Sequence, residues 1–123
     1  MLTNFLYVFL GGGMGSLVRF SISIATAHFF KSTFPVATLL SNLVSCFVLG
    51  ISLFLFYGKL NSELSLKFLI ITGFCGGFST FSAFSYETVS LLKIGQYQYA
   101  ILNILLNVVL CFGIIWLLLR SEV

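Results

Sequence analysis

Gly73-Phe-Cys-Gly-Gly-Phe-Ser-Thr-Phe-Ser-Ala-Phe-Ser-Tyr-Glu87 is the stretch of this sequence that decides the fold. It lies in a segment apolar enough to cross a membrane, yet it contains three glycines and five residues with hydroxyl groups. Glycine loosens a helix, and the hydroxyls of Ser and Thr compete for its backbone hydrogen bonds. The stretch therefore predicts a membrane-spanning helix that is broken near its middle.

The composition predicts an all-α integral membrane protein. Of 123 residues, 59% are hydrophobic and 7% are charged, whereas about a quarter of residues are charged in soluble domains. A spanning helix takes about 20 apolar residues, so the chain has room for four spans in one domain, residues 1–123. We expect a multi-pass protein of the cell membrane, in contact with lipid, whose first apolar run is a retained span rather than a signal peptide.

The apolar segments place the four spans at residues 4–30, 36–57, 66–92 and 97–119. The third span is longer than a bilayer requires. The surplus is consistent with a non-helical interruption at residues 76–80. Irregular backbone at membrane depth is tolerated only where it is buried in protein or lines a wet cavity, so the interruption predicts one of these two settings.

The charged residues are few, and they are balanced across the membrane. Six basic and three acidic residues occur singly, which argues against a nucleic-acid surface. Lys59, Lys67 and Arg120 fall on one predicted side, and Lys31 and Lys93 on the other. An excess of Lys and Arg on one side normally sets the orientation of a membrane protein, and here the two sides are nearly equal. This balance predicts insertion in both orientations and an antiparallel dual-topology dimer.

Polar side chains form two stripes along the predicted helices. The second span carries Thr38, Ser41, Asn42 and Ser45, and the fourth carries Tyr99, Asn103 and Asn107. Such residues can simply hold helices together, at about 0.6 to 2 kcal/mol for each hydrogen bond. Two stripes beside an interrupted span favour a permeation path instead. Amides, hydroxyls and phenylalanine ring edges suit a small anion, while carbonyls freed at residues 76–80 could hold a cation.

The first span combines small residues with one arginine. Gly11 with Gly15, and Gly12 with Ser16, are pairs of small residues four positions apart, which let helices approach closely. No Gly-Lys-Ser/Thr follows, so a phosphate loop is not expected. Arg19 costs at least about 2.5 kcal/mol at membrane depth, so it should face protein or water. Two roles stay open for Arg19. It either pins the helix or snorkels toward the membrane surface near the span end, or it raises the local concentration of an anion.

No catalytic or metal-binding constellation is evident among the remaining reactive side chains. Cys46, Cys75 and Cys111 fall in three different apolar segments, and His28 is the one histidine. We expect the cysteines to be small packing residues, without a structural disulfide or a metal site. No Ser, His and Asp set or carboxylate pair can be assembled, so an enzyme is not expected.

Four motifs in order resemble the Fluc (CrcB) fluoride channels over essentially the whole chain. They are Gly11-Gly12-x-x-Gly15-x-x-x-Arg19-Phe20, Phe34-Pro35-x-x-Thr38-Leu39-x-x-Asn42, the stretch from Gly73 to Glu87 quoted above, and Tyr99-x-x-x-Asn103-x-x-x-Asn107. The third motif is highly specific, whereas the first alone would be weak. The resemblance implies an antiparallel dual-topology dimer with two fluoride pores and a structural sodium ion at its centre.

The resemblance also implies roles for individual residues. Pore positions correspond to Phe81, Phe84, Asn42, Thr38, Ser82, Ser85, Asn103, Asn107 and Tyr99, a vestibule position to Arg19, and backbone carbonyl ligands of sodium to Gly76 and Ser79. The chain departs from the family where Ala37 replaces a usual Gly, where Ser79 replaces a usual Thr, and where Asn103 and Asn107 replace frequent Ser or Thr. Some members work as pairs of different subunits, but the retained Asn42, Phe81 and Phe84 favour a homodimer.

The sequence thus predicts a fluoride-selective passive channel that exports fluoride, with sodium as its only cofactor. Two other functions stay open. A small dual-topology multidrug exporter would need a carboxylate within the membrane, and the one candidate, Glu87, lies near a span end. A structural membrane protein would use its small and polar residues for helix packing alone.

Overall fold

The computed structural model describes residues 1–59 and 63–120 of the chain, and within these residues it is all-helical. Four helical segments there are long and apolar enough to cross a membrane: α1 (Leu2–Phe29), α2 (Val36–Leu55), a segment over Leu64–Lys93, and α7 (Tyr97–Leu119). The predicted class, an all-α protein with four membrane-spanning helices, is confirmed. Each observed span begins and ends within two residues of its predicted limits.

The third span is built from four helical pieces. They are α4 (Leu64–Lys67), the π-helix η1 (Phe68–Cys75), α5 (Gly76–Phe78) and α6 (Phe81–Lys93). Between α5 and α6 the backbone of Ser79 and Thr80 is extended, with φ, ψ of −81°, 154° and −150°, 116°. These two residues lie inside the interval where an interruption was predicted. The sequence showed no signal for the π-helix.

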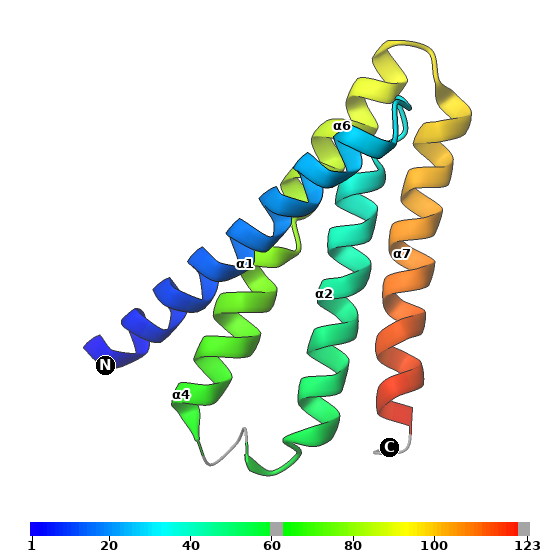
Figure 1. The fold of residues 1–123 in the computed structure, drawn as a ribbon. Coiled ribbons are helices and arrows are strands. Elements are labelled where there is room, and N and C mark those ends of the chain that lie inside the picture. The colour runs from blue at the N-terminus through cyan, green and yellow to red at the C-terminus, as the bar shows by residue number, and fades with distance from the viewer. Residues whose placement is uncertain (60–62, 121–123) are drawn as a thin grey trace.

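Two helix contacts dominate the packing, that of α2 with α7 and that of α1 with the third span. In Figure 1, α2 and α7 run side by side, while α1 is inclined to them and lies along η1 and α5. The α1 contact depends on glycine, because a Cβ at Gly11 would overlap the Leu69 carbonyl oxygen and one at Gly15 would overlap the Phe74 carbonyl oxygen. The predicted close approach of the first span therefore occurs against the third.

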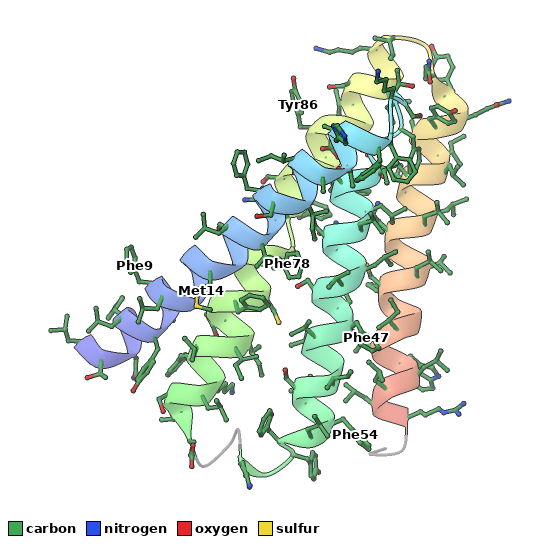
Figure 2. The ribbon with its side chains drawn as sticks, in the orientation of Figure 1. Phe9, Met14, Phe47, Phe54, Phe78 and Tyr86 are labelled. Carbon is green, nitrogen blue, oxygen red and sulfur yellow. The ribbon has the colours of Figure 1, made fainter. Side chains whose placement is uncertain are left out.

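The distribution of side chains is that of a protein in lipid. Among the residues labelled in Figure 2, Phe9 and Tyr86 extend away from the helices, whereas Phe78 is packed between them and is 1% exposed. Several fully buried positions are polar instead, including Ser41 and Asn103. A bilayer solvates apolar surface and leaves polar groups to find partners inside. This arrangement agrees with a multi-pass membrane protein.

Candidate functional site

The site is centred on the side chain of Asn42, in the first half of α2. Its Oδ1 accepts a hydrogen bond from the Thr80 backbone N–H at 2.9 Å, and its Nδ2 donates to Asn107 Oδ1 at 2.9 Å. One amide therefore joins three elements: α2, the extended residues between α5 and α6, and α7. An amide has two N–H protons, and the second Nδ2 proton of Asn42 has no partner among the described residues.

The hydrogen bonds continue from Asn42 along α7 to α6. Asn107 Nδ2 donates at 2.9 Å to both the backbone oxygen and Oδ1 of Asn103. Asn103 Nδ2 donates to Thr88 Oγ1 at 2.9 Å, and that hydroxyl donates to the Phe84 carbonyl at 2.8 Å. Asn103 and Asn107 of the fourth-span stripe thus belong to one continuous hydrogen-bonded chain inside the protein.

Thr80 is the N-cap residue of α6 and fixes where that helix begins. Its side-chain oxygen accepts a hydrogen bond from the Ala83 N–H at 3.2 Å, which is the usual role of threonine at a helix N-cap. In a continuous helix the Thr80 N–H would bond the Gly76 carbonyl, four residues earlier. Here it bonds Asn42 instead. Within residues 1–59 and 63–120, the Ser79 carbonyl accepts no hydrogen bond, and no side chain donates to the Gly76 carbonyl.

A cavity of about 310 Å³ opens beside Asn42. The residues that line it are Asn42, Cys46, Ser79, Thr80, Phe81, Phe84, Asn107, Val108, Cys111 and Phe112. The Phe81 and Phe84 rings lie 5.5 Å apart between centroids, with their planes inclined at 45°. The lining therefore offers amides, hydroxyls and aromatic rings, and it contains no acidic or basic side chain.

Other predicted pore residues lie outside this cavity. Thr38 donates to Glu87 Oε1 at 2.7 Å, and Glu87 lines a separate cavity of about 370 Å³. The hydroxyl of Ser82 lies 3.2 Å from that of Thr80, and Ser85 donates to the Phe81 carbonyl of its own helix at 2.9 Å. Tyr99 packs edge-on against Phe34, with the ring centroids 5.6 Å apart.

Arg19 contacts the third span directly. Its Nε donates to the Gly77 carbonyl at 3.3 Å, and the side chain is half-buried. This carbonyl lies just before the extended residues, where the regular helical hydrogen bonding stops. The contact is the one expected of an arginine that pins two helices together.

Thr88 is a site residue that the sequence reasoning missed. It is buried and links Asn103 of α7 to the Phe84 carbonyl of α6. A signal was present, because Phe81, Phe84 and Thr88 are spaced at i, i+3 and i+7 and so share one helical face. The two cysteines in the cavity carried no such signal, since they lie on different spans.

Comparison with known proteins gives a consistent result. The family model described as CrcB-like protein, Camphor Resistance (CrcB), matches residues 6–119. A Serratia proteamaculans protein named fluoride-specific ion channel FluC is 43% identical over 107 residues, which cover 87% of this chain and 84% of that protein. The protein of the same name from Flavobacterium psychrophilum is 40% identical over 89% of both chains. That from Shewanella frigidimarina is 45% identical over 94% of this chain and 93% of its own.

Proposed function

This chain belongs to the CrcB family, and from that premise we propose that it is a passive, fluoride-selective channel that exports fluoride across the cell membrane. The family is one of ion channels rather than enzymes. The observation that carries the proposal is the cavity beside Asn42, which combines hydrogen-bond donors with aromatic rings and has no charged lining residue.

The cavity chemistry favours a small anion. A fluoride ion that leaves water must replace its hydrogen bonds, and the unpaired Nδ2 proton of Asn42 is a donor that faces no competing partner in the described residues. The rings of Phe81 and Phe84 add their positive edges to the same space. A carboxylate here would repel an anion, and Glu87 lies in the other cavity.

We propose that the remaining polar residues extend the path to either side of this cavity. Asn107 and Asn103 continue the hydrogen-bonded chain along α7, and Ser82 and Ser85 lie on α6 beside the phenylalanines. Thr38, which donates to Glu87, lies in the first turn of α2, and Tyr99 lies in the first turn of α7. Hydroxyl and amide groups at successive positions replace the water around an anion and let it pass from one hydrogen-bond donor to the next.

The functional unit is proposed to be an antiparallel, dual-topology homodimer with two pores, and the interruption of the third span is proposed to lie at its centre. Phe81 is 79% exposed although it lines the cavity, and Gly76 and Ser82 are exposed as well. Exposed backbone and hydroxyl groups at membrane depth need protein or water beside them. A second copy that covers this face would supply the missing wall of the cavity.

A structural sodium ion fits the carbonyl groups at the interruption. Sodium, a hard cation, prefers oxygen ligands, and unwound helix segments offer their carbonyls to it. The Ser79 carbonyl accepts no hydrogen bond among the described residues, and the Gly76 carbonyl lacks its usual helical donor because the Thr80 N–H bonds Asn42. When bound, the ion would supply positive charge and fix the backbone around Thr80. Arg19 is proposed to add positive potential near the same path while it holds the Gly77 carbonyl.

The direct test measures anion flux in liposomes. Purified protein should release fluoride, detected by an electrode, far faster than it releases chloride under the same gradient. Equal rates for the two anions, or no flux in either case, would refute the proposal. Chemical crosslinking of the purified chain tests the homodimer separately. If the chain is monomeric and conducts fluoride only together with a second, different chain, the functional unit is a heterodimer.

A further inference from the structure

The cysteines divide into two groups in the folded chain. Cys75 is 4% exposed and lies under the Ser45 and Ser79 hydroxyls, which both donate to its backbone carbonyl. Cys46 of α2 and Cys111 of α7 are half-buried, and both line the cavity beside Asn42. All three are free thiols. The prediction that all three are packing residues therefore applies best to Cys75.

Cys46 and Cys111 are neighbours, although 64 positions separate them in the sequence. Asn42 of α2 bonds Asn107 of α7 directly. Cys46 and Cys111 each lie four residues further along the same two helices, on the same faces, and both line the cavity. Two thiols that come from facing helices and open onto one cavity form a preorganised pair. Metal binding to such a pair requires little rearrangement, because the two ligands are already held at one site.

We propose that Cys46 and Cys111 form a binding site for one soft monovalent cation of the Cu⁺ and Ag⁺ class, held between the two sulfur atoms. Soft thiolate ligands select such ions. When the ion binds, one thiol loses its proton to water and becomes a thiolate. The second thiol can stay protonated, so the complex of one cation, one thiolate and one thiol is neutral. Neutrality matters here because an unpaired charge is costly at membrane depth.

The two thiols and the other groups that line the cavity also predict which metals should not bind. Zn²⁺ in structural sites takes four ligands, and the described residues contain no cluster of three or more His, Cys, Asp or Glu side chains that could hold a metal. The other polar groups of the cavity are the amides of Asn42 and Asn107 and the hydroxyls of Ser79 and Thr80. They are weak ligands for zinc, so we expect Ag⁺ to bind and Zn²⁺ not to compete.

The site lies in the cavity that the proposed function assigns to fluoride, so this inference rests in part on that proposal. An Ag⁺ ion held between Cys46 and Cys111 would occupy space beside Asn42 and Phe84. We therefore expect occupancy of the pair to slow fluoride release. Binding and flux are measured separately, so that failure of one proposal can be told from failure of the other.

The binding experiment uses the full-length chain in detergent with Ag⁺ as the probe and a monothiol as competitor. The Cys75→Ser protein, which keeps the pair, should retain one Ag⁺ per chain. The further changes Cys46→Ser and Cys111→Ser should each weaken retention at least about a hundredfold, because a single thiol loses the effective concentration of its partner. Each protein is checked for helical content by circular dichroism, and the conservative Cys→Ala versions are measured where a serine variant fails to fold.

The binding and flux measurements each have one outcome that supports the proposal and one that refutes it. Loss of Ag⁺ on removal of either member of the pair, with retention in Cys75→Ser, supports the proposal whether or not the protein conducts fluoride. Equal retention by all variants, or loss in Cys75→Ser alone, overturns it. In liposomes, fluoride release that Ag⁺ slows in the wild type but not in Cys46→Ser supports a site within the path. Release that Ag⁺ does not affect, with binding intact, refutes that placement.

Discussion

Replacement of Asn42 by alanine tests the centre of the proposed site. The change removes two hydrogen bonds of 2.9 Å, one from the Thr80 N–H and one to Asn107 Oδ1. Interhelical hydrogen bonds in membranes contribute about 0.6 to 2 kcal/mol each. We therefore expect the Asn42→Ala protein to lose about 1 to 4 kcal/mol of stability, measured as a lower denaturation midpoint in detergent.

The effect on flux should be separable from the effect on stability. A hydrogen bond to a charged group contributes about 1.5 to 3 kcal/mol, so loss of the Asn42 donor from the anion path predicts a fall in fluoride flux of about 10- to 150-fold. The assay is fluoride release from liposomes, normalised to folded protein. Asn4→Ala is the matched control, because Asn4 lies near the start of α1 and outside the cavity.

A double-mutant cycle of Asn42 and Asn107 tests the hydrogen bond between the two side chains. The two side chains are directly bonded, so the losses in Asn42→Ala and Asn107→Ala should not add. We expect the double variant to be about 0.6 to 2 kcal/mol more stable than additivity predicts. Wild-type flux in folded Asn42→Ala protein would show that fluoride does not use this amide. Strict additivity would show that the two amides do not contact each other in the membrane.

Three further predictions address the rings, the glycines and the cation. Phe81→Ile and Phe84→Ile should each impair fluoride flux while crosslinked dimers persist, because isoleucine keeps the apolar surface and loses the ring edge; loss of flux in step with loss of the dimer would count against a pore role. Gly15→Ala should lower the denaturation midpoint, since its Cβ would overlap the Phe74 carbonyl oxygen and overpacking costs about 1 to 3 kcal/mol. The control Gly13→Ala, with nothing within 4 Å of the added Cβ, should be neutral or stabilising, and an equal loss in both variants would contradict the packing argument. Replacement of sodium by N-methylglucamine on both sides should reduce flux, and unchanged flux after prolonged dialysis would argue against a sodium site at Gly76 and Ser79.

The spans could be predicted because their signal is local. Apolar runs of about 20 residues report directly on the bilayer, and the observed helices α1, α2 and α7 begin and end close to their predicted limits. The position of the extended residues Ser79 and Thr80 could likewise be predicted, since glycine and hydroxyl residues cluster there. Each of these features depends on a short stretch of sequence and not on the partners it finds.

The partners themselves could not be read from periodicity. Helical spacing placed Asn42 on one stripe and both Asn103 and Asn107 on another, but it did not say that Asn42 would bond Asn107. That choice depends on the relative height of α2 and α7. The nearness of Cys46 to Cys111 depends on the same register. The π-helix η1 packs against α1, and no single stretch of sequence encodes that contact.

The geometry of Asn42 connects the two ions that the proposed function requires. Its Oδ1 accepts the Thr80 N–H, which therefore does not bond the Gly76 carbonyl, the proposed cation ligand. Asn42 also lines the cavity, and the second proton of its Nδ2 is the donor proposed for the anion. Without the Asn42 amide, the Thr80 N–H would be free to return to Gly76 and close the helix. The dependence of fluoride flux on sodium should therefore change in Asn42→Ala but not in Phe84→Ile, because Phe84 contributes a ring edge to the anion and nothing to the Gly76 carbonyl.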